Sequence, residues 1–192
     1  GIPIPKSLLP NFIELNESLI KSGFDAPLVV KLLESTHGLG VILSETHTNA
    51  ISTIEAFYRL KEKAMLQQFV KESSGVDIRA LVVDGTVVAS MRRQAGQGEF
   101  RSNLHRGATA TRVRLTEEEI FLSQKVCELL QLDIAGVDIL RSKTGPLILE
   151  VNSSPGLEGI ETVTGYDVAG DIIKFVERKV RKLKKLARKA RL

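Results

Sequence analysis

The sequence predicts an α+β fold with largely antiparallel sheets, and three observations support this class. Short β-branched runs are interspersed with segments whose apolar residues recur at helical spacing. Two pairs of these runs are joined by tight turns, around Asp84-Gly85 and near Thr144, as in β-hairpins. The chain of 192 residues is 43% apolar, which is enough for one domain or two small lobes.

The first 70 residues are expected to hold two helices and three strands. A helix over residues 11–22 ends at Gly23. The runs 28–33, 41–45 and 65–70 have the β-branched, apolar character of strands, and the segment 34–41 connects the first two. The second helix is expected to bury a stripe made of Ile51, Ile54, Phe57 and Leu60.

The Asp84-Gly85 turn sets the expected register of a central hairpin. If residue 83 pairs with residue 86, Asp77 lies opposite Arg92 and Arg79 lies opposite Ser90, all on one face. The polar segment 94–111 follows, and a loop of that length in a compact domain is usually functional or disordered.

The second half continues with a helix, another hairpin and a final helix. Thr116 and Glu119 have the spacing of a capping box at the start of the helix. The runs 136–142 and 146–152 are predicted strands joined by a short turn, and the last helix is expected to begin near Asp167.

The second hairpin brings three oxygen ligands together. With its turn near Thr144, Asp138 lies opposite Glu150, Asn152 shares their face, and Gly136 opposite Asn152 is expected to leave room for a ligand. Opposed carboxylates favour a bound cation, and an all-oxygen set suits magnesium. The alternative is a solvated sheet face on which Asn152 only shapes the next turn. The apolar context of both strands favours partnered polar groups.

Two features suit phosphate groups. Gly38 and Gly40 let backbone N–H groups approach phosphate oxygens closely, although a plain hairpin loop is the commoner interpretation. Lys31 lies in an apolar strand, where an ammonium group needs an anion, unless an edge strand lets it point to water. The long loop adds positive charge and donors for phosphoryl oxygens, from Arg101, Ser102 and Asn103.

Charge and cysteine content limit the function classes. Residues 178–192 hold nine Lys or Arg and no acid, so a net charge of +4 becomes −5 for the first 177 residues. No apolar run approaches the roughly 20 residues that cross a bilayer, and no signal segment opens the chain. We therefore expect a cytoplasmic protein with no membrane partner. Cys127 is expected to be a buried thiol, and no histidine has a recognisable nucleophile partner.

The C-terminal segment is predicted to form a basic amphipathic helix. Its apolar residues keep helical spacing while most others are Lys or Arg. Contact with RNA or with a polyanionic product is one interpretation, and a solvated, frayed helix is the alternative. The apolar positions are Ile172, Val176, Val180, Leu183 and Ala187.

Four segments together resemble the ATP-grasp ligases, and within them the RimK-type ribosomal-protein glutamate ligases. They are PLVVKLLESTHGLGV, QQFVKESSGVDIRALVV, EFRSNLHRGA and AGVDILRSKTGPLILEVNSSPGLEGIE. The resemblance extends from residue 1 to about 178 and implies an ATP-grasp fold, with two α+β lobes clasping a nucleotide. Residues 1–70, with a phosphate loop at 34–41, would form the lid lobe. Residues 71–177 would form the core lobe with the metal site, and 178–192 a basic tail.

The resemblance implies a role for each matching position. Lys31 and Arg101 are implied to neutralise phosphate charge during catalysis, and Asp138, Glu150 and Asn152 to bind magnesium or manganese, as two ions. The implied ATP-binding residues are Lys31, Gly38, Gly40, Gln68, Phe69, Val70, Asp77, Arg101, Ser102 and Asn103. The implied acceptor-pocket residues, in a loop that is otherwise an ordinary turn, are Asn103, Ser154 and Gly156.

The sequence departs from the family pattern in two places. The family commonly has glutamate at position 68, and Gln68 offers one acceptor where the adenine amino group needs it, so nucleotide affinity should change. Gln67 faces the other way and does not replace it. The family's N-terminal domain and an upstream lysine are not in this sequence, whose extended start, residues 2–5, reads as a connector. We expect this chain alone to bind ATP weakly and turn over poorly.

The implied activity is ATP- and magnesium-dependent amide formation through an acylphosphate. The resemblance implies addition of L-glutamate to the C-terminus of a ribosomal protein, or polymerisation of glutamate. We expect the protein to be a homo-oligomer. One alternative is another ATP-grasp ligase acting on an amino-group carrier protein or a small peptide. The other is a non-catalytic, ATP-responsive regulator that docks on ribosomes.

Overall fold

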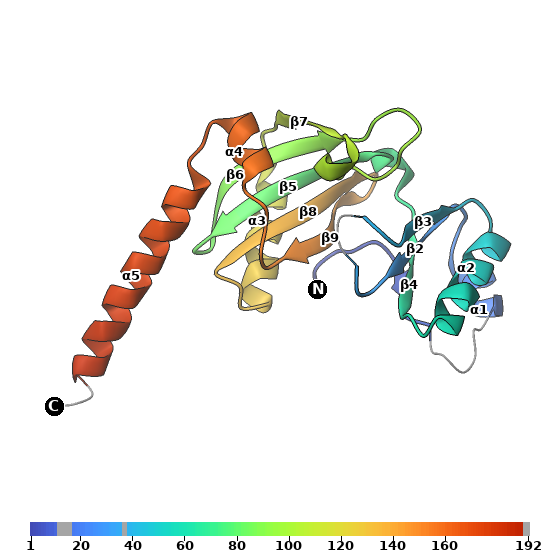
Figure 1. The fold of residues 1–192 in the computed structure, drawn as a ribbon, viewed down its shortest axis with the longest axis horizontal. Helices are drawn as coiled ribbons and strands as arrows, with labels where there is room; N and C mark the ends of the chain where they lie inside the picture. The colour runs from blue at the N-terminus through green and yellow to red at the C-terminus, as the bar shows by residue number, and fades with distance from the viewer. Residues whose placement is uncertain (11–16, 36–37, 190–192) are drawn as a thin grey trace.

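Two antiparallel sheets organise the molecule, which confirms the α+β class (Figure 1). The computed structural model describes residues 1–10, 17–35 and 38–189. The first sheet has the strand order β1-β4-β2-β3 and the second β7-β6-β5-β8-β9. Among the helices of these residues, none has the length and apolar character needed to cross a membrane.

The first sheet is covered on one face by two helices. Its strands are β1 (Ser7–Leu8), β2 (Leu28–Leu32), β3 (Val41–Ser44) and β4 (Ala64–Gln68). The helices are α1 (Glu17–Gly23) and α2 (His47–Arg59), and the N-terminal part of the helix expected over 11–22 lies outside the described residues. Leu60 does not belong to the buried stripe, because it caps the end of α2 and is 70% exposed. The buried residues between helices and sheet are Ile20, Phe24, Leu28, Val30, Ala50, Ile51, Ile54, Ala64 and Leu66.

The second sheet has helices on both faces. Its strands are β5 (Val76–Val83), β6 (Thr86–Gln94), β7 (Thr109–Arg112), β8 (Ile134–Ser142) and β9 (Gly145–Asn152). Helix α3 (Glu117–Leu129) packs on one face, and α4 (Glu158–Thr164) and the start of α5 (Val168–Lys189) pack on the other. The sequence patterns missed β1, β7, α4 and the single 3-10 turns at Lys71–Ser73 and Leu104–Arg106.

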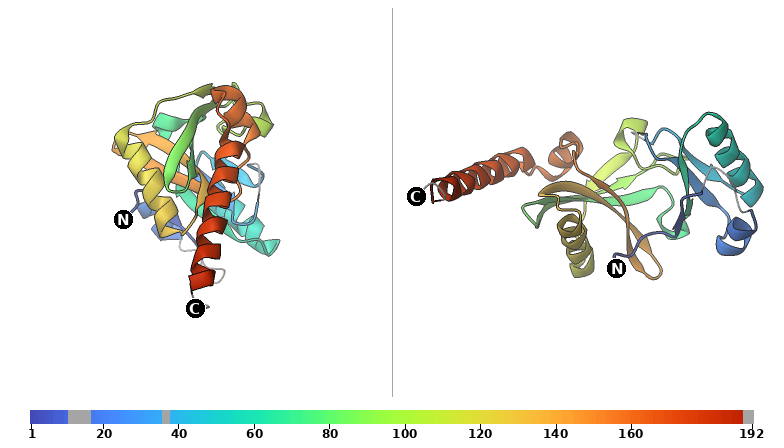
Figure 2. Two further views of the ribbon diagram at one scale, coloured as in Figure 1. Left: turned by 90° about the vertical axis from the view of Figure 1, so that its left-hand side faces the viewer. Right: turned by 90° about the horizontal axis from the view of Figure 1, so that it is seen from below.

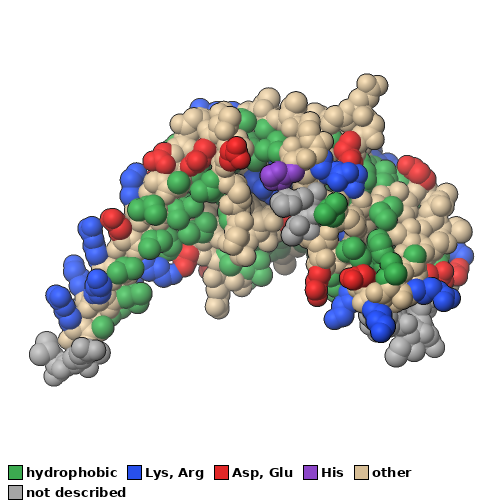
Figure 3. Space-filling view, viewed as in Figure 1, with side chains coloured by type: hydrophobic (Ala, Val, Ile, Leu, Met, Phe, Trp, Pro, Cys, Tyr) green, Lys and Arg blue, Asp and Glu red, His purple; other side chains and the backbone are tan. Residues whose placement is uncertain are grey.

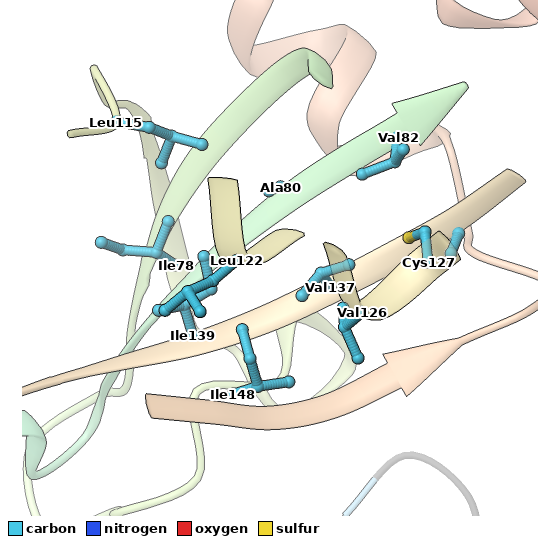
Figure 4. Packing of buried hydrophobic residues seen from close by; sticks show 11 residues of the cluster. Ile78, Ala80, Val82, Leu115, Leu122, Val126, Cys127, Val137, Ile139 and Ile148 are labelled. Atoms are coloured by element: carbon cyan, nitrogen blue, oxygen red, sulfur yellow. The ribbon is translucent and has the colours of Figure 1, made fainter. Parts of the chain in front are cut away.

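The core beneath α3 contains the predicted buried thiol (Figure 4). Val126 and Cys127 of α3 belong to one buried cluster with the alternate residues of β5 and β8 that point to this face, such as Ala80 and Val137. Cys127 is 1% exposed, and burial raises the pKa of its thiol. The predicted capping box at the start of α3 is present, with Thr116 and Glu119 bonded in both directions.

A β-bulge corrects the predicted register of the β5–β6 hairpin. Val83 pairs with Thr86 as expected, but the pairing shifts by one residue between Leu81 and Val82. Asp77 therefore lies opposite Arg93 rather than Arg92. In the same way, Arg79 lies opposite Met91 and not opposite Ser90. Because side chains alternate along a strand, the bulge brings Arg93 to the face that Asp77 occupies.

Candidate nucleotide and metal site

One face of the second sheet changes character along its strands. On β5, Leu81 and Val83 belong to the apolar cluster beneath α4 and α5. Two and four residues earlier, Arg79 and Asp77 point to the same face, because side chains two apart share a face. This polar end of the sheet lies beside the first sheet (Figure 1). We call the surface that carries Asp77 and Arg79 the polar floor.

Two aspartates and two arginines form a continuous network on this floor. The Arg93 guanidinium donates to both carboxylate oxygens of Asp77, at 2.6 and 2.5 Å, and lies 2.9 Å from Asp138. Arg79 donates to both oxygens of Asp138, each at 2.7 Å. All four side chains are at least 86% buried. The charges balance in pairs, as buried ions require.

The network keeps Asp138 ionised. Burial by itself raises the pKa of a carboxyl group, but the charge of Arg93 and the bidentate bonds from Arg79 outweigh it, and the pKa of Asp138 is lowered. Asp77 is 5% exposed, and Ser102 Oγ also donates to it at 2.6 Å. Both oxygens of Asp77 therefore accept bonds within the protein, as both oxygens of Asp138 do.

The β8–β9 hairpin has the predicted register at the three proposed metal ligands. Asp138 lies opposite Glu150 and Gly136 opposite Asn152, next to an irregularity between Asp138 and Ile139. Glu150 is exposed, and its carboxylate makes no hydrogen bond or ion pair with the residues that the structure describes.

The space beside Gly136 is not open to a ligand, which corrects the prediction from the sequence. A Cβ atom at this position would come within 2.9 Å of Pro155 Cβ and within 3.7 Å of Arg79 Nε. Gly136 is therefore required for the loop after β9 to pack across the strand. Ser154 and Gly156, predicted to shape an acceptor pocket, are exposed on that loop.

Lys31 faces the polar floor from the first sheet. It lies on β2, an interior strand between β4 and β3, so the edge-strand interpretation is wrong. Because Leu28 and Val30 point to the helices, Lys31 points to the opposite face. Burial lowers the pKa of its ammonium group, while the charges of Glu150 and Asp138 oppose that shift. Lys31 is thus a cation close enough to two of the proposed metal ligands for their charges to act on its pKa.

Arg101 connects the long loop of the second sheet to the glycine loop of the first. Its Nε and Nη2 atoms donate to the Glu99 carboxylate at 2.9 and 2.7 Å. Its Nη1 atom donates to the carbonyl oxygens of Gly38 at 3.1 Å and Val41 at 3.3 Å. The glycine loop is consequently more than a plain hairpin connection, since it is bonded to a charged group of the other sheet.

Gly38 and Gly40 both have backbone conformations that favour glycine. Their φ angles are +72° and +64°. A Cβ atom on Gly38 would lie 2.7 Å from Asn103 Oδ1, and one on Gly40 would lie 2.5 Å from Leu32 Cδ1. The close approach of Gly38 and Asn103 brings two of the predicted phosphate-binding segments together.

Glu99 organises the Arg101 segment. Besides the guanidinium of Arg101, it accepts bonds from the backbone N–H groups of Phe100 at 2.9 Å and Arg101 at 3.0 Å, and from Arg106 Nε at 3.3 Å. The hydrogen bonds from the Arg101 side chain lead the causes that lower the pKa of Glu99 to about 2. Glu99 stays ionised across the physiological range and orients Arg101.

The predicted adenine hinge lies at the end of β4. The side-chain amide of Gln68 exchanges hydrogen bonds with the backbone of Asp25, at 3.1 and 2.9 Å. Gln67 faces the other way, as expected, and binds Ser7 Oγ at 3.0 Å. Phe69 meets Phe100 edge to face at 6.4 Å, and Val70 is buried. An open groove of about 490 Å³ is lined by Asp25, Gln68, Phe69, Lys71, Glu72 and Lys143.

The donor set suits a hard cation in its chemistry. Asp138, Glu150 and Asn152 offer only oxygen ligands, as Mg²⁺ and Mn²⁺ prefer. No group of three or more His, Cys, Asp or Glu residues that could hold a metal ion occurs within 1–10, 17–35 and 38–189. Two carboxylates and one amide are too few for an all-protein cage, and they fit an ion that keeps waters and phosphate oxygens as its other ligands.

The sequence patterns missed three residues of this site. The patterns put Arg79 on the correct face but assign it no role. They predict Arg92 rather than Arg93 opposite Asp77, because the bulge has no local signal. They do not single out Glu99 within its polar loop. A signal for Glu99 was present, because an acid two residues before an arginine in a glycine-rich segment can accept the backbone N–H groups that follow it.

The chain forms two antiparallel α+β lobes. The polar floor of one lobe faces Lys31 and the glycine loop of the other, and this arrangement is the ATP-grasp fold. Solved ATP-grasp structures share this fold. D-alanine–D-alanine ligase from Bacillus anthracis, complexed with ATP, aligns with a TM-score of 0.71 and 22% identity over 96% of this chain and 63% of that one. The ATP-grasp ligase PsnB, complexed with a precursor variant, Mg and ADP, aligns with a TM-score of 0.69 and 19% identity over 94% and 55%.

The chain belongs to the RimK-like ATP-grasp domain family, whose model matches residues 1–176. It is 54% identical over 178 residues to a probable alpha-L-glutamate ligase of Syntrophotalea carbinolica, covering 93% of this chain and 59% of the relative. It is 56% identical over 162 residues to the probable alpha-L-glutamate ligase of Aeromonas salmonicida, covering 84% and 54%. The chain thus spans less than two thirds of the length of these relatives.

Proposed function

We propose that this chain is the nucleotide- and metal-binding part of an ATP-dependent ligase that joins L-glutamate to a carboxylate through an amide bond. The observation that carries this proposal is the position of Lys31, a cation of one lobe that lies close enough to Glu150 and Asp138 of the other for their charges to act on its pKa. Membership of the RimK-like family and the names of its relatives support glutamate as the amino acid.

In this proposal the residues of the two lobes have different roles. Lys31 and Arg101 bind phosphate oxygens and neutralise charge that develops on them. Gly38 and Gly40 let the loop backbone close over the phosphates. Asp138, Glu150 and Asn152 hold Mg²⁺ or Mn²⁺, which supplies electrostatic stabilisation of the transferred phosphoryl group.

Buried side chains hold the metal ligand Asp138 in position. Arg79 and Arg93 fix the carboxylate of Asp138, and Asp77 with Ser102 fixes Arg93. The adenine ring is proposed to lie in the groove beside Phe69 and Val70, reading backbone atoms, since the Gln68 amide is bonded to Asp25. The exposed loop with Ser154 and Gly156, together with Asn103, is proposed to border the acceptor.

The acceptor is proposed to be the C-terminus of a ribosomal protein or a growing glutamate chain. An amino-group carrier protein or a small peptide is the alternative acceptor, and it would use the same phosphate chemistry. A non-catalytic regulator would bind ATP without releasing phosphate.

A two-part experiment tests the proposal. Calorimetry with a non-hydrolysable ATP analogue should give binding that requires Mg²⁺ or Mn²⁺ and is lost in the Lys31→Gln variant. Phosphate release should then depend on both L-glutamate and a peptide ending in glutamate. Metal-dependent binding with no phosphate release for any acceptor would favour the regulator, and absence of binding would retire the proposal altogether.

A further inference from the structure

Helix α5 extends beyond the body of the protein. Its first turns pack on the second sheet, where Val168 and Phe175 are buried. Arg178 pairs with Asp84 at 3.1 Å, and Lys179 pairs with Asp133. From Val176 to Lys189 every residue is exposed, and the helix projects away from both sheets (Figure 2). We call residues 180–189 the α5 spur.

The spur continues a stripe of exposed aliphatic side chains. Their spacing of three or four residues places them on one side of the helix. Figure 3 shows apolar side chains along α5 beside a margin of Lys and Arg. The exposed fractions are 60% for Ile173, 45% for Val176, 42% for Val180, 57% for Leu183 and 55% for Leu186. An exposed apolar stripe of this length indicates an interaction surface.

The charge on this part of the helix has one sign. Residues 178–189 contain eight Lys or Arg and no acid, and the family match ends before them, at residue 176. On a helix with 3.6 residues per turn, cations border both edges of the stripe. Lys184 and Arg188 lie along one edge, and Lys182 and Lys189 along the other.

The combination of stripe and charge selects the partner. RNA phosphates would satisfy the cations but leave the aliphatic side chains in water. The same helix of a second copy would cover the stripe but would oppose eight cations with eight more. The stripe also has no polar residue to set a register with a partner helix. A surface that is apolar beneath a diffuse layer of negative charge matches both features.

We propose that the α5 spur docks this protein on a bilayer that contains acidic phospholipids, lying in the plane of the interface. The expectation of no membrane partner rested on the lack of a spanning segment, and a helix that lies in the interface does not need one. The proposal is independent of the ligase activity, because the stripe belongs to no part of the phosphate site.

Vesicle flotation of the whole chain tests the proposal. Vesicles of phosphatidylcholine mixed with phosphatidylglycerol should bind the protein about tenfold or more tightly than vesicles of phosphatidylcholine alone, and the difference should shrink at high salt. The double variant Val180→Ser/Leu183→Ser keeps every charge and should lose about tenfold in binding to the acidic vesicles. The matched control is Phe121→Ser, because Phe121 is 61% exposed on α3, and it should bind like the parent.

A chain ending at Lys179 keeps both ion pairs to the body and serves as a second variant that spares the core. It should not float with acidic vesicles, while its nucleotide binding should equal that of the parent. Equal flotation of the parent and the double variant would overturn the proposal, because the stripe would then play no part. Absence of flotation by the parent would also overturn the proposal. Binding of an RNA hairpin or an acidic helical peptide to the spur, without flotation, would have the same consequence.

Discussion

Arg101 donates to the carbonyl oxygen of Gly38 at 3.1 Å while the rest of its guanidinium is held by Glu99. One side chain therefore links the glycine loop of the first sheet to the long loop of the second. In the proposed function the Arg101 guanidinium also binds phosphate, so the nucleotide and the backbone of the glycine loop compete for it or share it. The position of the glycine loop and the binding of phosphate should therefore depend on each other.

Replacement of Glu99 by Gln is expected to weaken nucleotide binding. The variant removes the charge that orients Arg101, and a charge-assisted hydrogen bond of a partly exposed pair contributes roughly 1 kcal/mol, or about fivefold in the Kd. Calorimetry with an ATP analogue and Mg²⁺ measures it. Glu128→Gln, at an exposed acid that pairs with Lys125, is the control, and equal affinities for the two variants would contradict the orienting role.

Comparison of Gly38→Ala with Gly85→Ala should separate the effect of backbone strain on stability from the effect of a new side chain on nucleotide binding. Both glycines have nearly the same φ, +72° and +71°, so both variants should lose roughly 1 kcal/mol of stability. Only at Gly38 would the new Cβ atom meet Asn103, at 2.7 Å, whereas nothing lies within 4 Å at Gly85. Urea unfolding should show similar losses, and nucleotide titration should show weaker binding for Gly38→Ala alone.

The two proposed metal carboxylates should respond differently to neutralisation. Glu150 is exposed and makes no hydrogen bond or ion pair with the described residues, so Glu150→Gln should change stability by less than about 0.5 kcal/mol. The same variant should reduce Mg²⁺-dependent nucleotide binding by at least about tenfold. Asp138→Asn leaves two buried guanidinium groups undercompensated and should cost about 3–5 kcal/mol. Urea unfolding and calorimetry measure both effects. A Glu150→Gln protein that keeps full Mg²⁺-dependent binding would remove Glu150 from the metal site.

Lys31 should give nucleotide binding an alkaline limit. Burial lowers the pKa of Lys31 below 10.5, so the ammonium loses its proton at a lower pH in the folded chain than in the unfolded one. Affinity for phosphate should therefore fall as the pH rises through the folded value. Folding stability changes in the opposite sense, since the unfolded state then binds more protons and stability rises with pH in that window.

A pH series of ATP-analogue binding, compared between the parent and Lys31→Arg, checks this prediction. Arginine keeps its charge at every pH of the series, so the alkaline decline should disappear in the variant even if its affinity at neutral pH is lower. A decline of the same size in both proteins would assign it to another group.

The sequence predicted most of the elements because their signals are local. The capping box at Thr116, the turn at Asp84-Gly85 and the stop at Gly23 each depend on a few adjacent residues. Helix α4 and strand β7 were missed because they are short and lie in polar or glycine-bearing segments, where packing against β6 rather than propensity sets the structure.

By itself the sequence determined that residues 136–142 and 146–152 form a hairpin, because a tight turn leaves little freedom in a short connection. The pairing of Asp138 with Glu150 agrees with the prediction but depends on a one-residue shift between Asp138 and Ile139. Only the tertiary structure decided that Arg93 rather than Arg92 reaches Asp77, since a bulge responds to packing on both faces of the sheet. It also decided that Pro155 fills the space over Gly136, that Arg79 and Arg93 hold Asp138, and that the stripe of α5 stays exposed. Each of these depends on contacts between residues far apart in the chain, which no local pattern encodes.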